Sequence, residues 1–471
     1  MGHGFGEDKH PVSEAGATDV ARLVGTSACG GVGKVGFWKG EDCGHAVRGL
    51  QWSKELLFHR ADVGCILERQ RCCIYRIMKE MAQDHKIGKT LFGQTQPELA
   101  ALMALMGEPK YRAAQVMDAL YRQRIESLEG MTTLPAALRD QLRADGYSVG
   151  VPEIAQIFTS VDGTERYLIR LADGQTVETV WMPDGDGGER GDGSEAAEEE
   201  ESDEPLEPAR FRRATICISS QVGCAVNCQF CLTAKLGLQR NLTAGEIAGQ
   251  VVAVLNRHSV ELASKRASRP ERINLVFMGM GEPFLNYDAF MTAVRLLVVA
   301  VGIPESRMTV STSGIVPAIR EFAKETIRPK LAVSLNASSN ATRLEIMPIT
   351  KKWDIPQLFA ALKEMPLRTR EAVTFEYVLL GGVNDQPEHA RELLQMLSES
   401  GLKAKINLIV WNPGPGIEYK QPKAEDVEWF QKRLIAAGVR TYIRRPRGRD
   451  IYAACGQLKR TVENEPLVTI G

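Results

Sequence analysis

The sequence predicts an α/β protein: a partial (β/α) barrel preceded by a small N-terminal helical domain and an antiparallel β meander. Three observations predict this fold. Apolar residues recur at helical spacing between residues 96 and 145, three short strand-like runs follow up to residue 182, and strands alternate with helices beyond residue 209. A chain of 471 residues is long enough for all of these parts.

The composition is that of a soluble globular protein, with 44% hydrophobic and 25% charged residues. No apolar run approaches the roughly 18 residues that a membrane span needs, and none has the length of a signal peptide. We therefore expect a cytoplasmic protein without a membrane partner. In a reducing compartment the ten cysteines favour metal ligation or catalysis over structural disulfides.

Residues 1–90 show glycine-rich stretches and little sustained periodicity. We expect a poorly ordered extension there, or a mis-called start, because Met78 and Met81 lie just before the first helical pattern. Five cysteines in this segment have no repeated ligand spacing and are interpreted as incidental thiols: Cys29, Cys43, Cys65, Cys72 and Cys73.

Residues 91–150 are predicted to form a small helical accessory domain, and residues 151–183 the meander. In the meander the strand-like runs 154–159, 166–171 and 176–182 are separated by turns rich in Asp and Gly. The apolar positions that predict the helices are Leu99, Leu102, Met103 and Met106, followed by Val116, Met117, Leu120 and Tyr121.

Residues 184–208 form an acidic insert with twelve Asp or Glu residues against one Arg, a local charge of -11. With almost no apolar residue, this insert cannot offset its ordering entropy, so we expect a disordered loop. The net charge of the whole chain is -1, so the remainder carries about +10 and can meet a phosphate backbone.

Residues 209–463 are predicted to form the catalytic domain. A helix at 243–257 opens with a capping box of Thr243 and Glu246, and another helix covers 424–437. The predicted strands are 213–219, 273–279, 307–313, 330–336, 372–380, 405–411 and 440–445.

Three cysteines, Cys224, Cys228 and Cys231, are separated by three and then two residues. Three thiolates can hold three corners of a [4Fe-4S] cubane and leave the fourth iron open for a cosubstrate. Ferredoxin-type ligation by four cysteines leaves no such position, and a structural zinc site needs a fourth Cys or His. The spacing therefore predicts a radical S-adenosylmethionine (SAM) enzyme, with a zinc knuckle as the alternative.

Glycines and small polar residues follow several predicted strands, namely at 278–283, 311–313, 334–336 and 411–413. Because strand ends meet at the mouth of a barrel, we expect these residues to bind the ribose, ammonium and carboxylate groups of a cosubstrate. Cys217 and Cys455 do not fit the cluster spacing, and by residue type alone each is a small buried hydrophobe.

The chain resembles the RlmN and Cfr family of RNA methyltransferases from about residue 96 to residue 462. The resemblance is strongest in the blocks 214–234, 278–283, 311–317, 406–413 and 447–458. It implies methylation of carbon 2 of adenine in 23S rRNA and beside the anticodon, at position 37, of some tRNAs. It further implies one [4Fe-4S] cluster, two SAM molecules consumed per turnover, an electron donor such as flavodoxin, and a monomer.

The resemblance also assigns roles to residues that spacing alone leaves unexplained. Cys455 would accept a methyl group from a first SAM and become S-methylcysteine. A radical formed from a second SAM would activate that methyl group for addition to the adenine. Cys217 would then form a transient disulfide with Cys455 to release the product, and Glu178 would accept the proton, although the Cys217 thiolate is an alternative acceptor.

By the same resemblance, the SAM contacts are Gly281, Glu282, Ser311, Ser334, Leu335, Asn336 and Asn412. The family usually has His at the position of Asn336, and the acidic insert is not a usual family feature. The candidate RNA backbone contacts are the helical domain at 91–150 and two basic runs, 210–213 and 444–449. Two alternative functions stay open: Cfr-like methylation of carbon 8, and a non-catalytic iron–sulfur or zinc RNA-binding protein.

Overall fold

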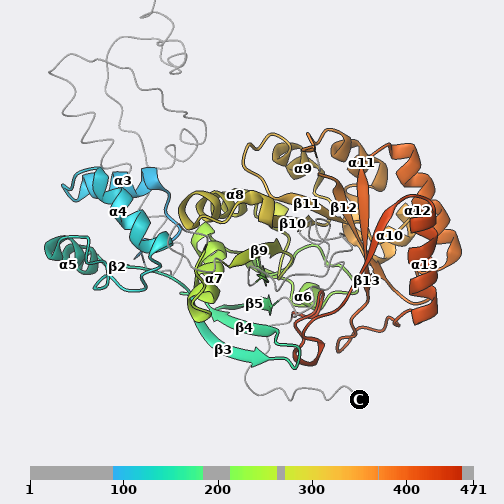
Figure 1. The fold of residues 1–471 in the computed structure, drawn as a ribbon, viewed down its shortest axis with the longest axis horizontal. Coiled ribbons are helices and arrows are strands. Elements are labelled where there is room, and N and C mark those ends of the chain that lie inside the picture. The colour runs from blue at the N-terminus through green and yellow to red at the C-terminus, as the bar shows by residue number, and fades with distance from the viewer. Residues whose placement is uncertain (1–88, 184–212, 263–270, 370, 459–471) are drawn as a thin grey trace, which may run out of the picture. The chain divides into compact units, whose positions relative to one another are not determined.

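The computed structural model describes residues 89–183, 213–262, 271–369 and 371–458 (Figure 1). All of them belong to the unit Arg76–Gly471. Three predictions lie outside the described residues: the N-terminal extension apart from its last two residues, the whole of the acidic insert, and residues 210–212 of the first basic run. No described helix is long and apolar enough to cross a membrane.

The helical region consists of three short helices and one small pair of strands. The first helix begins with a capping interaction in which the Glu98 carboxylate accepts a 2.7 Å hydrogen bond from the Thr95 amide. The predicted apolar positions Leu99, Met103 and Val116 are buried, which confirms the helical spacing. The elements are β1 (Lys89–Thr90), α3 (Gln96–Leu105), α4 (Tyr111–Met117), a π-helical turn (Asp118–Arg122), α5 (Ala136–Ala144) and β2 (Tyr147–Ser148), with β1 parallel to β2.

Within the described residues, ten strands form one continuous sheet in the order β14-β13-β12-β11-β10-β9-β6-β5-β4-β3. From β6 to β14 all neighbours are parallel, while β3, β4, β5 and β6 pair antiparallel. The meander is therefore an extension of the barrel sheet. The strands are β3 (Glu153–Thr159), β4 (Glu165–Arg170), β5 (Thr176–Pro183), β6 (Arg213–Cys217), β9 (Arg272–Phe277), β10 (Met308–Thr312), β11 (Lys330–Ser334), β12 (Val373–Leu379), β13 (Ala404–Val410) and β14 (Arg440–Arg444).

The seven predicted barrel strands are all present, and each ends one or two residues earlier than predicted. The predicted ends 218–219, 278–279, 313 and 335–336 lie in loops instead. Several of these positions hold Gly, Ser or Asn, and their backbone leaves the hydrogen-bonded strands to form the rim of the barrel. Most of the residues expected to bind a cosubstrate thus lie on rim loops, while Ser311 and Ser334 lie at the ends of β10 and β11 themselves.

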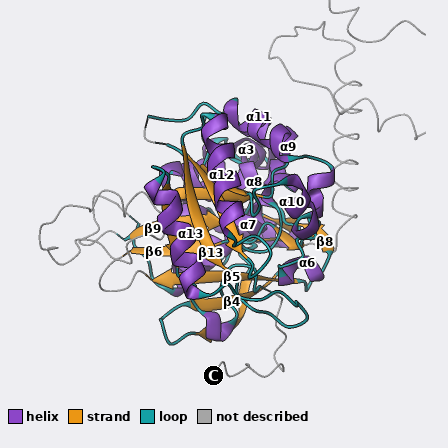
Figure 2. Cartoon of the chain, turned by 90° about the vertical axis from the view of Figure 1, so that its right-hand side faces the viewer, coloured by secondary structure: helices purple, strands orange, loops and turns teal. Residues whose placement is uncertain are grey.

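Helices follow the parallel strands and lie around the sheet, as Figures 1 and 2 show. The Thr243 capping box is confirmed, with the Glu246 amide donating to Thr243 Oγ1 at 3.1 Å and the Thr243 amide donating to Glu246 Oε2 at 2.9 Å. The helices are α7 (Ala244–Arg257), α8 (Tyr287–Arg295) with a π-helical continuation (Leu296–Val301), α9 (Val316–Phe322), α10 (Asn340–Ile346), α11 (Ile355–Lys363), α12 (Pro387–Ser400) and α13 (Ala424–Ala436).

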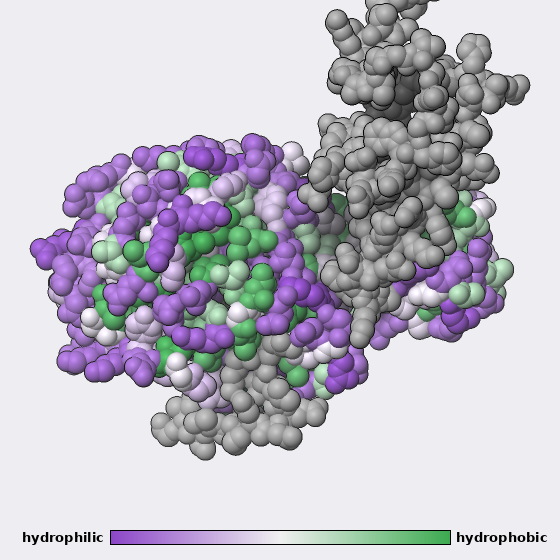
Figure 3. Space-filling view, turned by 180° about the vertical axis from the view of Figure 1, so that it is seen from behind, coloured by the Kyte–Doolittle hydropathy of each residue, from purple (hydrophilic) through white to green (hydrophobic). Residues whose placement is uncertain are grey.

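One supersecondary unit was absent from the sequence prediction. Between β6 and α7 the chain forms a hairpin of β7 (Gln221–Gly223) and β8 (Leu238–Asn241), with the short helix α6 (Leu232–Lys235) between its strands. On the face seen from behind, hydrophobic residues gather in the middle of the barrel part and hydrophilic residues surround them (Figure 3).

Candidate active site

The cysteine loop lies inside the β7–β8 hairpin. The Cys224 amide donates a 3.1 Å hydrogen bond to the Gly237 carbonyl, and the Cys231 amide donates to the Cys228 carbonyl at 3.3 Å. Asn227 adopts a left-handed conformation (φ 60°), which reverses the chain between the first two cysteines. These contacts bring three thiols onto one loop at the rim of the barrel.

The three thiols are free and partly buried. Burial raises the pKa of Cys224 to about 12 and raises the pKa of Cys228 and Cys231 as well, and each of the three thiols interacts electrostatically with a neighbour of the group. A bound cation reverses this effect, because metal ligation favours the thiolate. The loop can therefore hold a cluster through three thiolates.

The donor set fits a cubane. Each cysteine of such a cluster binds a different iron, so the three sulfur atoms need not converge on one point. In the described part of the chain, no group of three or more His, Cys, Asp or Glu residues is arranged to hold a single metal ion. Glu282 lies beside the loop, and its charge acts on both Cys224 and Cys228.

The residues proposed to bind SAM are brought together at neighbouring strand ends. Ser311 and Ser334, at the ends of β10 and β11, have their hydroxyl oxygens 3.3 Å apart. The Glu282 carboxylate accepts hydrogen bonds from the Ser313 amide at 2.6 Å and the Phe284 amide at 3.0 Å, and burial raises its pKa. Gly281 has φ 100°, and a Cβ there would lie 2.6 Å from Gln221 Cβ, so glycine is required.

Leu335 and Asn336 are both fully buried. The Asn336 side chain accepts a 2.8 Å hydrogen bond from the Val378 amide and donates to Met347 Sδ at 3.1 Å. Both polar atoms of this side chain are thus already bonded within the protein. The nitrogen retains a second N–H group and the oxygen a second lone pair, so neither bond has to break for the Asn336 side chain to contact a cosubstrate.

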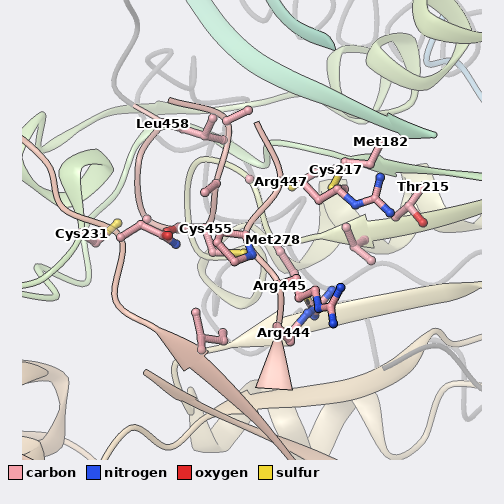
Figure 4. Close-up of a pocket in the computed structure, with 18 of the residues that line it drawn as sticks. Met182, Thr215, Cys217, Cys231, Met278, Arg444, Arg445, Arg447, Cys455 and Leu458 are labelled. Atoms are coloured by element: carbon pink, nitrogen blue, oxygen red, sulfur yellow. Dashed lines mark hydrogen bonds between the residues drawn. The ribbon is translucent and has the colours of Figure 1, made fainter. Parts of the chain in front are cut away.

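Cys217 and Cys455 open onto the same cavity of about 170 Å³. Figure 4 shows Cys455 between Cys231 on one side and Cys217 on the other. The electrostatic interactions agree with this order of the three cysteines, because the charge of Cys455 acts on Cys217 and the charge of Cys231 acts on Cys455. Two cysteines that are 238 positions apart in the sequence therefore face one space beside the cluster loop.

No local sequence pattern predicts the structure of the segment around Cys455. Cys455 lies in a turn that follows a 3₁₀ helix (Arg449–Ile451). The turn is held from two sides: the Leu232 amide donates to the Gly456 carbonyl at 2.8 Å, and Asn412 Nδ2 donates to the Cys455 carbonyl at 3.2 Å. A helix would have bonded these carbonyls internally, whereas here they are used to dock the turn.

The Asn412 side chain therefore bonds directly to the turn that carries Cys455. Its other side-chain atom, Oδ1, is buried and has no hydrogen-bond partner within the described residues. An unsatisfied buried acceptor in the wall of a cavity is a binding group for a ligand donor such as a ribose hydroxyl. This atom supports the expected SAM contact of Asn412 at the end of β13.

Glu178 is not the solvent-facing strand residue that its sequence context alone suggests. It is fully buried and forms an ion pair with Arg166, which is also fully buried. Val180 pairs with Cys217 and Met182 with Thr215 across β5 and β6. Because alternate strand residues share a face, Glu178 lies on the face of the sheet that Cys217 and Met182 present to the cavity.

The sequence reasoning missed one residue of the cavity wall. The sequence pattern predicts Arg444 only as an RNA backbone contact, but Arg444 lines the cavity with both cysteines, and its guanidinium pairs with the buried Glu376 carboxylate at 3.5 Å. Desolvation raises the pKa of Cys455, and the Arg444 guanidinium opposes that shift. Arg444 is the last residue of β14. The expectation that residues at strand ends line the mouth of the barrel could therefore have identified it.

A partial barrel with a three-cysteine loop at its rim defines a radical SAM enzyme. The family described as the radical SAM superfamily matches residues 218–397, and the ribosomal RNA large subunit methyltransferase N-terminal domain matches residues 89–146. The chain belongs to the RlmN family of radical SAM RNA methyltransferases. A [4Fe-4S] cluster and SAM are the cofactors that this membership implies.

Relatives support this assignment over most of their length. A probable dual-specificity RNA methyltransferase RlmN of Koribacter versatilis is 59% identical over 76% of this chain and 98% of its own. The corresponding protein of Lawsonia intracellularis is 40% identical over 81% of this chain and 99% of its own. The crystal structure of a radical SAM methyltransferase from Sphaerobacter thermophilus matches with a TM-score of 0.67 at 39% identity, over 79% of this chain and 100% of that one.

Proposed function

We propose that this enzyme methylates carbon 2 of adenine in 23S rRNA, at the peptidyl-transferase centre, and at position 37 of some tRNAs. The observation that carries the proposal is that Cys217 and Cys455 open onto one cavity next to Cys231. A non-catalytic RNA-binding protein has no use for two thiols placed in this way, whereas the two-cysteine chemistry of the family requires them.

In this proposal Cys224, Cys228 and Cys231 ligate one cluster per chain. When bound, the cluster and SAM supply the 5′-deoxyadenosyl radical. Cys455 carries the methyl group, which it takes from a first SAM, so that two SAM molecules are consumed per turnover. The turn around Cys455 is bonded to Leu232 and Asn412, and these contacts keep the methyl carrier at a fixed place in the cavity.

Cys217 is the last residue of β6, an interior strand of the sheet, and it releases the product. The bond between the Cys455 sulfur and the transferred carbon breaks as Cys217 forms a disulfide with Cys455. Burial raises the pKa of Cys217 to about 12, so its thiol is protonated near neutral pH. This protonation favours Glu178 over the Cys217 thiolate as acceptor of the proton that the adenine loses.

The residues that we assign to SAM binding are Gly281, Glu282, Ser311, Ser334 and Asn412. The buried residues Leu335 and Asn336 form part of the wall of this site. The Glu282 carboxylate accepts two backbone hydrogen bonds and retains lone pairs for an ammonium group. Ser311 and Ser334 offer adjacent hydroxyl groups. Polar groups at successive strand ends are suited to a ligand with ribose and carboxylate groups.

For RNA we assign the helical region at 91–150 and the basic run at 444–449. Two arginines of this run differ in their roles: Arg445 is exposed at the cavity, while Arg447 donates a 2.7 Å hydrogen bond to the Pro183 carbonyl. Arg445 is thus the better phosphate contact and Arg447 a support for the loop. We further propose that the enzyme is a cytoplasmic monomer and that a flavodoxin-like donor supplies its electrons.

Mass spectrometry of nucleosides from a null strain complemented with this gene tests the function. We expect 2-methyladenosine in 23S rRNA and tRNA, no product with Cys455→Ala, and unchanged product with Cys43→Ala as the matched control. Appearance of 8-methyladenosine would establish the Cfr-like alternative. If the Cys455→Ala variant methylated at the wild-type rate in a purified assay, the two-cysteine mechanism would be wrong.

A further inference from the structure

Arg343 in α10 is a buried arginine to which the proposed function assigns no role. Only 1% of it is exposed. Its guanidinium donates four hydrogen bonds, to the Leu335 carbonyl (3.1 Å), to Thr350 Oγ1 (3.0 Å), to the Ser313 carbonyl (2.6 Å) and to the Ser334 carbonyl (3.2 Å). Every one of these acceptors is a neutral oxygen.

The acceptors place Arg343 directly behind the proposed SAM site. Ser313 follows the end of β10, and Ser334 ends β11, so one side chain joins the two strand ends whose hydroxyl groups face each other. Among the described residues, Arg343 forms no ion pair with a carboxylate. A guanidinium that is removed from water without a carboxylate is costly unless another negative charge lies close to it.

The cluster loop is the neighbour that can supply that charge. The Gln229 amide, between Cys228 and Cys231, donates a 2.9 Å hydrogen bond to the carbonyl of Ile346, at the end of the helix that carries Arg343. Cys228 packs against a small buried hydrophobic cluster that includes Ile346 and Met347. The helix that carries Arg343 and the loop that carries Cys228 are thus bonded to each other and packed together.

The charges agree with this arrangement. Burial lowers the pKa of Arg343 to about 10, and the interaction with Cys228 works in the opposite direction. Arg343 therefore remains a cation near neutral pH. A [4Fe-4S] cluster in its 2+ state with three thiolates carries a net charge of -1, and the uptake of one electron from a one-electron donor makes it -2.

We propose that Arg343 is a positioning residue that provides the buried counter-charge of the cluster and raises its reduction potential, while it fixes the strand ends at the SAM site. A nearby cation stabilises the -2 state more than the -1 state, and in a site without water this difference is only weakly screened. The inference rests on the proposed cluster ligation by Cys224, Cys228 and Cys231.

Two variants separate the charge of Arg343 from its hydrogen bonds. Arg343→Gln keeps donor groups and removes the charge, whereas Arg343→Lys keeps the charge and loses most of the bonds. The midpoint potential of the anaerobically reconstituted holoenzyme is measured by dithionite titration, with the reduced cluster followed by electron paramagnetic resonance. We expect a shift to more negative potential in Arg343→Gln, and a potential close to the wild-type value in Arg343→Lys.

Arg328→Gln is the matched control, because Arg328 is also buried but pairs with Glu371 at the opposite end of β11. We expect it to leave the potential unchanged. An unchanged potential in Arg343→Gln, or equal shifts in the Gln and Lys variants, would overturn the counter-charge role. Iron analysis of the wild type and of Cys228→Ala distinguishes this failure from an error in the cluster assignment, because the latter would leave the iron content of both proteins the same.

Discussion

Asn412 Nδ2 donates a 3.2 Å hydrogen bond to the backbone carbonyl of Cys455. The bond joins the end of β13 to the turn that carries the proposed methyl acceptor. Because the opposite side of that turn is bonded to Leu232, next to the last cluster cysteine, Asn412 helps to fix the distance between the Cys455 thiol and the cosubstrate site.

Replacement of this amide should therefore affect the methyl carrier before it affects the fold. We expect Asn412→Ala to reduce the fraction of S-methylated Cys455 at least tenfold, measured by peptide mass spectrometry, at a cost in stability of about 1–2 kcal/mol. Asn256→Ala is the control, since Asn256 makes a comparable amide-to-carbonyl bond to Arg124 far from the cavity. Full S-methylation in Asn412→Ala would contradict the positioning role.

The buried pair of Glu178 and Arg166 predicts different results for its two members. Arg166→Met leaves a buried carboxylate without its partner, which should destabilise the fold by about 3–5 kcal/mol, measured by thermal unfolding. Glu178→Gln leaves the buried guanidinium without its carboxylate and should also be destabilised, but the folded protein should accept the methyl group on Cys455 and lose most of the RNA methylation. A Glu178→Gln enzyme with an unchanged single-turnover rate would rule out Glu178 as the proton acceptor.

The cysteine loop depends on the close approach of two backbone segments. A Cβ at Gly223 would lie 1.7 Å from the Gly237 carbonyl oxygen, whereas a Cβ at Gly237 meets nothing within 4 Å, although both residues have positive φ. Gly223→Ala should thus abolish cluster loading, measured as iron per chain. Gly237→Ala, with backbone strain of about 1 kcal/mol and no clash, should retain it.

The raised pKa of Cys217 predicts a loss of stability at alkaline pH. The unfolded thiol loses its proton around pH 9.0, but the folded one does so only at about 12, so above pH 9 the folded state binds more protons. Stability should therefore fall by about 1.4 kcal/mol per pH unit between pH 9 and 12 on account of this group. Thermal unfolding of the apoprotein should show a smaller decline in Cys217→Ala than in the wild type.

The acidic insert should be dispensable for methylation. Its charge repels phosphate, so it is expected to face away from the RNA. We expect deletion of residues 185–204 to leave the yield of methylated nucleoside unchanged in the complementation assay. A large loss of activity would show that the insert contributes to RNA binding or to folding.

The sequence was a good guide where the determinant is local. The spacing of Cys224, Cys228 and Cys231, the capping box at Thr243 and the alternation of strands and helices are read from residues that are neighbours in the chain. It was a poor guide where the partner is distant. The β7–β8 hairpin, the burial of Glu178 against Arg166 and the turn at Cys455 depend on contacts that no local pattern records.

By itself, the sequence of this protein determined the class of chemistry, because three thiolates at this spacing leave one iron of a cubane free. Only the tertiary structure decided which other groups share the site. The parallel sheet carries Cys217 to the cavity, and docking of the last turn onto β13 brings Cys455 opposite it. Their meeting requires closing a chain segment of more than two hundred residues, and only the packing of the whole barrel stabilises such a contact.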